Sequence, residues 1–115
     1  MPEDCLFCRI VSGDIPATII REGPRTLALR DVTPQAPTHV LLIPREHHDT
    51  AADLVANAPD VLRELHEQAS AVAESEGISV TGYRLVYNTG EQGGQSVNHV
   101  HLHLLGGRPM GWPPG

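Results

Sequence analysis

Hydrophobic and polar residues alternate most regularly near the end of the chain, between His99 and Leu104. Every second residue there is Val or Leu, and each residue between them is a histidine. Successive side chains of a strand point to opposite faces, so alternation with period two indicates a half-buried strand. The pattern predicts a strand over 99–105, with Val100 and Leu102 among its core residues and three imidazoles on its other face.

Four earlier segments also have the composition and alternation of strands. The segment 39–44 is nearly all apolar, which favours a central position in a sheet. Before it lie Pro34 and Pro37, which favour an ordered loop over either regular structure. The four predicted strands cover residues 18–22, 26–31, 39–44 and 83–88.

Two segments repeat their apolar residues at helical spacing, and they predict one short and one long helix. The short helix follows Asp4, a possible N-cap, and ends at Ser12 and Gly13. The long helical region covers 51–76, where Pro59 is tolerated only near a helix start. Its apolar face carries Val61, Leu62, Leu65, Ala69, Val72 and Ala73, and its polar face carries Arg63, Glu64, Glu67, Gln68, Glu74 and Glu76. In this region His66 is interpreted as a solvated or edge residue without a role.

Length and charge limit the class of protein. A chain of 115 residues is expected to form a single domain, 1–115. Its net charge of −6 and its eight Lys and Arg residues argue against binding along a nucleic-acid backbone, although a small phosphorylated ligand is allowed. No apolar run reaches the roughly 20 residues that span a bilayer, and the N-terminus lacks signal-peptide features. We therefore expect a cytoplasmic protein with no membrane partner.

The two ends of the chain carry its cysteines and its single tryptophan. In a cytoplasmic protein Cys5 and Cys8 are not expected to form a structural disulfide, which leaves a metal pair, a redox pair or two free thiols. The tail 106–115 is rich in Pro and Gly, so an extended segment is expected. Trp112 in this tail packs either on its own domain or on a partner subunit.

The row of histidines supports two chemistries. Two strand histidines can hold a catalytic metal, or a neutral imidazole can act as the nucleophile while its neighbours bind a phosphate. At about 3.3 Å per residue, the Cα atoms of His99 and His103 are roughly 13 Å apart, which is too far for easy convergence on one ion. The spacing favours His101 as the reacting group. The metallohydrolase that uses His99 and His101 as ligands stays as an alternative.

A glycine-rich connection, 89–98, precedes the histidines. On its own it predicts a hairpin loop. Beside three aligned imidazoles it becomes a candidate phosphate loop, because glycine lets backbone N–H groups approach an anion closely.

The motif His99 to Leu105 resembles the signature of the histidine-triad (HIT) superfamily. The blocks 31–39, 93–97 and 105–115 are similar to those of its Hint branch, the purine nucleoside phosphoramidases. The resemblance implies an α+β fold with a five-stranded antiparallel sheet. It also implies a homodimer with a continuous ten-stranded sheet, in which the Trp112 tail lies near the partner subunit.

The activity implied by the resemblance is hydrolysis of the P–N or acyl-phosphate bond in conjugates of purine nucleoside monophosphates. His101 would be the nucleophile and would carry the nucleotidyl group as a covalent intermediate, with no cofactor needed for the chemistry. His103 would contact the phosphoryl oxygens, Ser96 the leaving nitrogen, and His39 would relay protons. A non-catalytic scaffold dimer that binds nucleotides is a further alternative.

The resemblance also implies ligand sets. The residues implied in nucleotide binding are Asp31, Val32, Asn88, Gly94, Gln95, Ser96, His101, Leu102 and His103. Asp31 would bind the ribose hydroxyls and Val32 would flank the base. Members of the branch with a Cys-x-x-Cys motif bind a structural zinc, and the matching ligands here are Cys5, Cys8, His47 and His99. The leaving group, the choice between adenine and guanine, and the pathway stay open.

Overall fold

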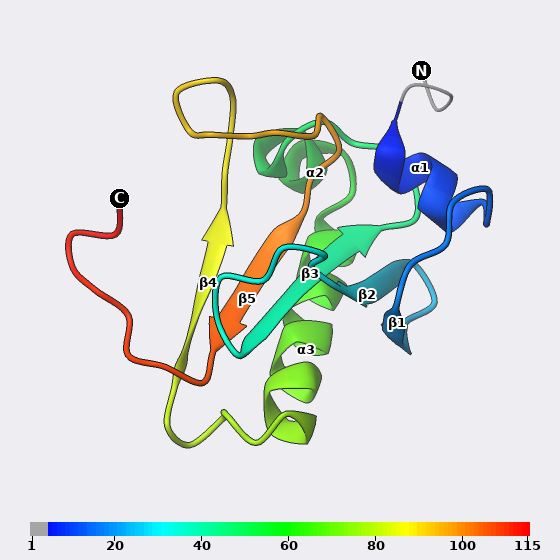
Figure 1. Cartoon of the computed structure of the whole chain (residues 1–115). Helices are drawn as coiled ribbons and strands as arrows, with labels where there is room; N and C mark the ends of the chain where they lie inside the picture. The colour runs from blue at the N-terminus through cyan, green and yellow to red at the C-terminus, as the bar shows by residue number, and fades with distance from the viewer. Residues whose placement is uncertain (1–4) are drawn as a thin grey trace.

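The structure is a computed structural model and describes residues 5–115 (Figure 1). None of the helices in this part of the chain is long and apolar enough to cross a membrane. In chain order the elements are α1 (Leu6–Val11), β1 (Ile19–Glu22), β2 (Thr26–Arg30), β3 (Thr38–Pro44), α2 (Ala51–Asn57), α3 (Pro59–Ser75), β4 (Tyr83–Tyr87) and β5 (Leu102–Gly106).

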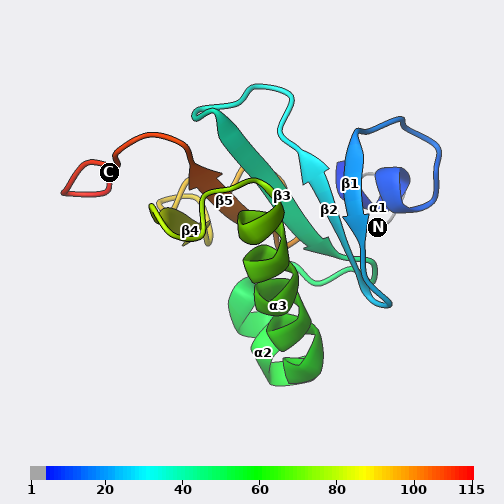
Figure 2. The same cartoon turned by 90° about the horizontal axis from the view of Figure 1, so that it is seen from below.

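The strands form one antiparallel sheet with the order β1-β2-β3-β5-β4. This confirms the predicted α+β fold with five strands and the central position of β3. Both α2 and α3 lie on one face of the sheet, and α1 lies at the end that carries β1 (Figure 2). The C-terminal tail leaves the sheet at the end opposite α1 in both views (Figures 1 and 2).

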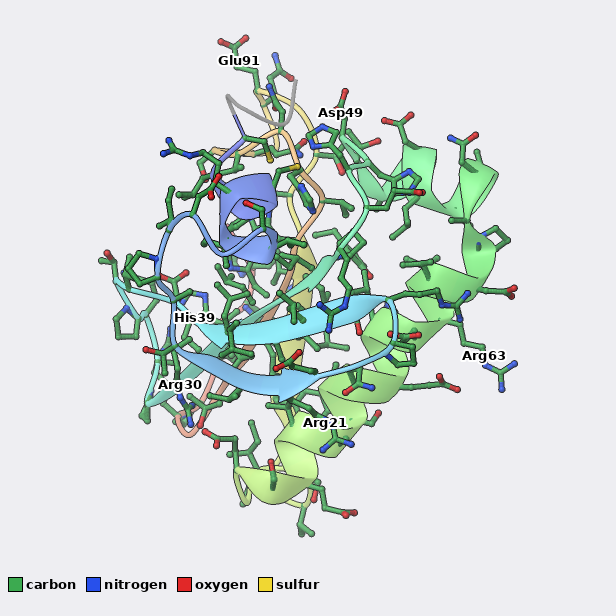
Figure 3. The ribbon with its side chains drawn as sticks, turned by 90° about the vertical axis from the view of Figure 1, so that its right-hand side faces the viewer. Arg21, Arg30, His39, Asp49, Arg63 and Glu91 are labelled. Atoms are coloured by element: carbon green, nitrogen blue, oxygen red, sulfur yellow. The ribbon has the colours of Figure 1, made fainter. Side chains whose placement is uncertain are left out.

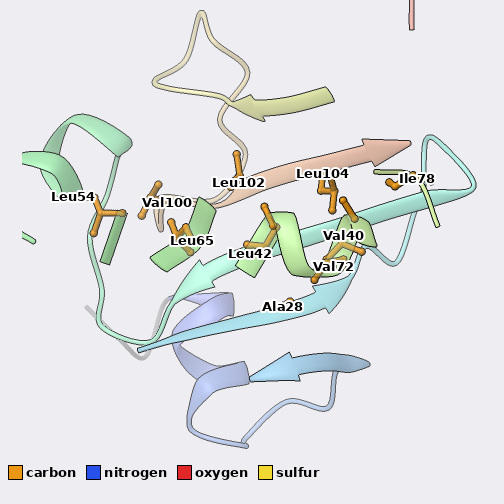
Figure 4. Packing of buried hydrophobic residues seen from close by; sticks show 12 residues of the cluster. Ala28, Val40, Leu42, Leu54, Leu65, Val72, Ile78, Val100, Leu102 and Leu104 are labelled. Atoms are coloured by element: carbon orange, nitrogen blue, oxygen red, sulfur yellow. The ribbon is translucent and has the colours of Figure 1, made fainter. Parts of the chain in front are cut away.

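Two apolar clusters cover the two faces of β3. Between the sheet and α3, Leu42, Leu102 and Leu104 pack against Leu65 and Val72 (Figure 4). Complete burial of a Leu side chain contributes about 1.5–3 kcal/mol, so this layer supplies much of the driving force for folding. The cluster on the opposite face contains Cys5, Phe7, Ile10, Leu27, Leu29, Leu41 and Ile43.

The region predicted as one long helix consists of two helices. The break falls at Ala58, whose φ of −150° and ψ of 65° are not helical, and Pro59 is the first residue of α3. Proline restricts the residue before it and has no N–H to continue a helix, which is the reason for the break. The prediction of a single helix was therefore wrong, while the predicted apolar face of α3 is correct.

The predicted helix cap and the start of the last strand also differ from the structure. The side chain of Cys5 caps α1 by accepting a hydrogen bond from the Cys8 N–H at 3.3 Å; the predicted cap, Asp4, lies outside the described residues. The last strand begins at Leu102 rather than at residue 99. The paired strand β3 ends at Pro44, which has no N–H to extend the ladder.

Glu64 is the clearest departure from the predicted helix faces. It was assigned to the polar face, but its side chain is buried between α3 and the β1-β2 turn. One carboxylate oxygen accepts hydrogen bonds from the Arg25 N–H at 2.9 Å and from the Thr26 hydroxyl at 2.7 Å. Burial alone would raise the pKa of Glu64, but these hydrogen bonds and the Arg25 guanidinium together lower it. The carboxylate therefore stays ionised and ties the turn to the helix.

Substitution Glu64→Ala is expected to lower the free energy of unfolding by about 2–3 kcal/mol, because it leaves the buried Thr26 hydroxyl without its acceptor. Urea denaturation would measure the change. The control is Glu67→Ala, which removes an exposed carboxylate of the same helix that pairs with Arg63 at 3.2 Å. That control should change stability by less than about 0.5 kcal/mol. Equal effects of the two substitutions would contradict a role for Glu64 in holding the turn.

Candidate functional site

His101 presents a lone pair to the site. The ring is almost fully buried, and Phe7 packs edge-on against it with 5.0 Å between ring centroids. Its Nδ1 lies 2.8 Å from the backbone carbonyl oxygen of His99. A carbonyl oxygen can only accept, so Nδ1 carries the proton and Nε2 carries the lone pair. Among residues 5–115 no group is hydrogen-bonded to this Nε2.

The proton of His39 is fixed by a backbone amide in the loop before β3. The Gln35 N–H donates to Nδ1 of His39 at 3.0 Å, so Nδ1 of the neutral ring is unprotonated and Nε2 carries the hydrogen. Nε2 of His39 then lies 2.9 Å from Nδ1 of His103 and 3.4 Å from a carboxylate oxygen of Asp31. His39 therefore donates to His103, with Asp31 as a second, longer partner. Figure 3 shows His39 on the sheet, away from the end where Asp49 and Glu91 lie.

This chain of hydrogen bonds sets the tautomer of His103. Because Nδ1 of His103 accepts from His39, the neutral ring carries its hydrogen on Nε2. Burial, with smaller contributions from His101 and His39, lowers the pKa of His103 from 6.5 to about 4, against the opposing effect of Asp31. Burial also lowers the pKa of His39, again opposed by Asp31. Both rings are therefore neutral at neutral pH, as the tautomers require.

Nε2 of His103 is a buried donor without an acceptor. Among the described residues it is the one buried side-chain nitrogen or oxygen that has no hydrogen-bond partner. The ring centroid lies 5.0 Å from that of His101. A buried donor left unpaired costs about 1–3 kcal/mol, which an acceptor on a ligand would recover. The site thus sets a nucleophilic lone pair beside an N–H that can bind an anionic oxygen.

The same hydrogen bonds disfavour a catalytic metal at these histidines. Ligand atoms of Asp31, His39 and His103 lie within 4.8 Å of one another, which is close enough for a shared ion. However, Nε2 of His39 carries a hydrogen and has no lone pair to offer while Gln35 donates to Nδ1. The lone pair of His99 faces two cysteines instead of His101. The geometry therefore favours imidazole chemistry over the metallohydrolase alternative.

Gln95 shapes the glycine-rich loop. Its side-chain oxygen accepts from the Gly90 N–H at 3.0 Å, and its side-chain nitrogen donates to the Asp49 carbonyl at 2.6 Å and the Val97 carbonyl at 3.1 Å. The backbone N–H groups of Gly94 and Gln95 donate to carbonyls of the same loop. These two amides, which the sequence suggested as phosphate donors, are therefore already in use. Ser96 is exposed beyond them and has no such bond.

An apolar cavity of about 430 Å³ lies beside the loop and α1. Asp31, Val32 and Ser96 contribute to its lining, so three of the predicted nucleotide-binding residues meet there. Asn88 does not line this cavity, and the Leu102 side chain belongs to the core on the opposite face. The apolar part of the lining was not predicted from the sequence; it is formed by Leu6, Phe7, Ile10, Ile15, Pro16, Ala17, Leu29 and Leu41.

The helical periodicity of α1 does not distinguish the apolar residues that pack in the core from those that line a cavity. Leu6 is 44% exposed, and Val32, in the loop after β2, is 96% exposed. Exposed apolar residues beside a cavity are typical of a ligand site, but their exposure is known only from the fold.

The four predicted metal ligands come together beneath α1. The ligand atoms of Cys5, Cys8, His47 and His99 lie within 4.8 Å of one another. Nδ1 of His99 is 3.3 Å from Sγ of Cys5 and 3.5 Å from Sγ of Cys8, and Nδ1 of His47 is 3.3 Å from Sγ of Cys8. Ligands of a tetrahedral zinc would be about 3.6 Å apart, so the spacing fits.

The second nitrogen of each of these histidines has an acceptor. Nε2 of His99 donates to the Pro44 carbonyl at 2.8 Å, and Nε2 of His47 donates to the Asp49 carboxylate at 2.7 Å. These bonds leave both Nδ1 atoms free to coordinate, as is usual for metal-binding histidines. The donor set and its supporting bonds therefore fit a closed zinc site.

Comparisons with known proteins define the class. The model of the HIT domain matches residues 12–110, and the chain belongs to the HIT domain family. Over 111 residues it is 44% identical to purine nucleoside phosphoramidase of Escherichia coli (strain K12), covering 96% of this chain and 93% of the relative. It is 46% identical to the 14 kDa zinc-binding protein of Brassica juncea, covering 97% of this chain and all of that one.

A solved structure gives the same result. The HIT family hydrolase from Legionella pneumophila Philadelphia 1 superposes with a TM-score of 0.93 at 51% identity, covering 97% of this chain and 100% of that one. Together with the phosphoramidase similarity, this likeness identifies the chain as an enzyme, a hydrolase.

Proposed function

We propose that this hydrolase cleaves the P–N or acyl-phosphate bond of conjugates of purine nucleoside 5′-monophosphates. The observation that carries the proposal is the pair of complementary nitrogens, the lone pair on Nε2 of His101 and the unpaired N–H on Nε2 of His103. A phosphoryl centre needs a nucleophile at phosphorus and a donor at its oxygens. The similarity to the phosphoramidase of Escherichia coli supports the same substrate class.

In the first step Nε2 of His101 attacks phosphorus and the bond from phosphorus to the leaving nitrogen breaks. The nucleotidyl group is then held on Nε2, while the hydrogen on Nδ1 continues to donate to the His99 carbonyl. His103 donates to a phosphoryl oxygen, where negative charge develops. The leaving amine takes one proton by way of the Ser96 hydroxyl, which regains it from solvent.

In the second step water attacks phosphorus and the bond to His101 breaks. The electron pair of that bond returns to Nε2, so the ring regains its neutral tautomer. The proton of the water passes to solvent, and the nucleoside monophosphate leaves. His39 supports both steps because its N–H keeps His103 in the tautomer that donates to phosphate.

The cavity beside α1 is proposed as the nucleoside site. Its walls are apolar side chains, which suit a flat purine ring, and Asp31 at its rim offers a carboxylate to the ribose hydroxyls. Asp31 already accepts one hydrogen bond from the Thr33 N–H at 2.8 Å, which fixes the direction of the carboxylate. Ser96 lines the same cavity and would mark the end nearest the phosphate.

The Cys5, Cys8, His47 and His99 cluster is proposed to hold a structural zinc. With four protein ligands the site leaves no position for water or substrate, so the metal would stabilise the fold and take no part in the reaction. His99 would connect the two sites, since its backbone carbonyl orients His101. The named zinc-binding relative supports this proposal.

A homodimer through β4 is also proposed. This strand is at the edge of the sheet, and Leu85 on it is 36% exposed. In the tail, the ring of Trp112 is 83% exposed and has room to contact a second subunit. Pairing of two β4 strands would give the continuous sheet of ten strands and bury these surfaces. A monomeric mass by light scattering at micromolar concentration would refute it.

The function is tested with zinc-stripped protein that retains its circular-dichroism spectrum. We expect it to release AMP from adenosine 5′-phosphoramidate, because none of the proposed steps uses a metal. Turnover that is absent in the stripped, folded protein and returns only with added metal would favour the metallohydrolase. Nucleotide binding without any turnover in either form would favour the scaffold.

A further inference from the structure

The first residues of the C-terminal tail, Gly107 and Arg108, form the tail root. They pack against the loop before β3, whose residue Gln35 fixes the tautomer of His39. Thr38 and Gly106 are partners in the pairing of β3 with β5, so the residues just beyond Gly106 emerge beside that loop. Nε of Arg108 donates to the Gln35 carbonyl oxygen at 3.0 Å. The N–H of the same Gln35 donates to Nδ1 of His39 at 3.0 Å. Gln35 is therefore held from both sides.

Gly107 gives an independent sign of this fit. Its φ is +89°, a conformation that favours glycine, and a Cβ atom added there would lie 2.9 Å from Cβ of Pro37. The tail root and the loop thus approach each other more closely than two ordinary residues could. Contacts of this kind restrain the position of the loop backbone.

We propose that Arg108 is a positioning residue for the reaction, acting through Gln35 to keep Nδ1 of His39 unprotonated. The inference rests on the proposed function. Arg108 binds the carbonyl of the peptide after Gln35, whereas the N–H that faces His39 belongs to the peptide before it, so the restraint acts through the backbone of Gln35. Without this hydrogen bond the Gln35 backbone can rotate, its N–H can leave Nδ1 of His39, and His39 can then place its hydrogen on Nδ1. Nε2 of His39 becomes an acceptor in that tautomer.

A change of tautomer at His39 also changes the tautomer of His103. His103 must then donate from Nδ1 to Nε2 of His39, and its own Nε2 loses its hydrogen. The nitrogen that faces the phosphoryl oxygens becomes a lone pair, which repels them. The hydrogen bond of Arg108 therefore acts together with the Asp31 carboxylate, 3.4 Å from Nε2 of His39, to keep the tautomer in which the site offers a donor to the substrate.

The first test is Arg108→Ala, with two readouts. We expect kcat for AMP release from adenosine 5′-phosphoramidate to fall roughly two- to tenfold, as suits one hydrogen bond, while KM changes by less than about twofold. Long-range ¹H–¹⁵N spectra of the imidazoles should show partial protonation of Nδ1 of His39. A merely structural loss would lower activity without this change in the ring signals.

Three further substitutions separate the effect of the Arg108–Gln35 hydrogen bond from general order in the tail. Arg84→Ala removes a hydrogen bond of 2.7 Å to the Gly111 carbonyl and should leave the His39 signals as in the wild type. Gly107→Ala should push the loop through Pro37 and lower kcat in the same direction as Arg108→Ala. In contrast, Gly111→Ala should keep the wild-type kcat, because a Cβ there meets no atom within 4 Å.

The proposal is overturned if Nδ1 of His39 stays unprotonated and kcat is unchanged in Arg108→Ala. It is also overturned if Arg84→Ala shifts the His39 signals equally. Its failure is distinguishable from failure of the proposed function. If the wild type does not release AMP, the proposed function fails, while the ring signals of the two arginine variants still test the role of the Arg108–Gln35 hydrogen bond.

Discussion

Substitution of His101 by alanine is expected to lower kcat for AMP release by roughly 10³- to 10⁶-fold, because removal of a nucleophile removes the covalent route. The reason is that no other lone pair in the site can replace Nε2 of His101, since Nε2 of His103 carries a hydrogen. AMP should still bind, because the cavity and Asp31 are unchanged. Steady-state assays and calorimetric titration with AMP measure the two effects.

The intermediate itself can be detected. Rapid quench of the wild type during turnover into alkaline denaturant, in which the P–N bond of a nucleotidyl-histidine survives, followed by peptide mass spectrometry without an acid step, should find one adenylyl group on the peptide that contains His101. The control is His66→Ala, which removes an exposed imidazole of α3 whose partner is the Tyr87 hydroxyl at 3.1 Å. Turnover by the His101 variant at the rate of this control would rule out the covalent mechanism.

Removal of zinc should have the second large effect. With free zinc at a thousandfold of its dissociation constant, the metal is expected to add about 4 kcal/mol to the free energy of unfolding. Urea denaturation with and without a chelator measures this difference. Elemental analysis of the refilled protein should give one zinc per chain.

His47 and His48 are adjacent in the chain, so substitution of one tests the zinc site and substitution of the other is the control. His47→Gln should abolish zinc retention, because Nδ1 of His47 lies 3.3 Å from Sγ of Cys8. His48→Gln should retain the metal, since the His48 side chain bonds to the Glu46 carboxylate at 3.1 Å and lies outside the cluster. Loss of zinc from both variants, or equal stability with and without chelator, would contradict a structural metal.

Local patterns in the sequence carried much of the fold. Alternation from residue 99 onward correctly separated Val100, Leu102 and Leu104 from the histidines, although the strand itself begins only at Leu102. The five strands were also predicted correctly from local patterns, and their antiparallel arrangement was correctly implied by the family resemblance. Burial of Glu64 was missed, since periodicity divides a helix into faces but does not show that a turn around residue 25 covers one of them.

The chemistry of the site depends on contacts that the sequence does not contain. His39 and His103 are 64 residues apart, and the hydrogen positions on both rings follow from a backbone N–H in a third segment. The resemblance implied that Gln95 contacts the nucleotide, and in the fold its side chain bonds to Gly90, Asp49 and Val97. The contact with Asp49, 46 residues away, could not be predicted from the identity of the residue.

The short length of α1 affects which residues of the cavity wall can be substituted. A helix of six residues is too short to be stable alone, so its position depends on what fastens it. Cys5 and Cys8 join it to His47 and His99 in the proposed zinc site, while Leu6, Phe7 and Ile10 form part of the cavity wall. The cavity wall and the proposed reacting histidines therefore lie in separate segments of the chain, and we expect substitutions at Leu6 or Ile10 to reshape the proposed base pocket while the proposed phosphate chemistry is retained.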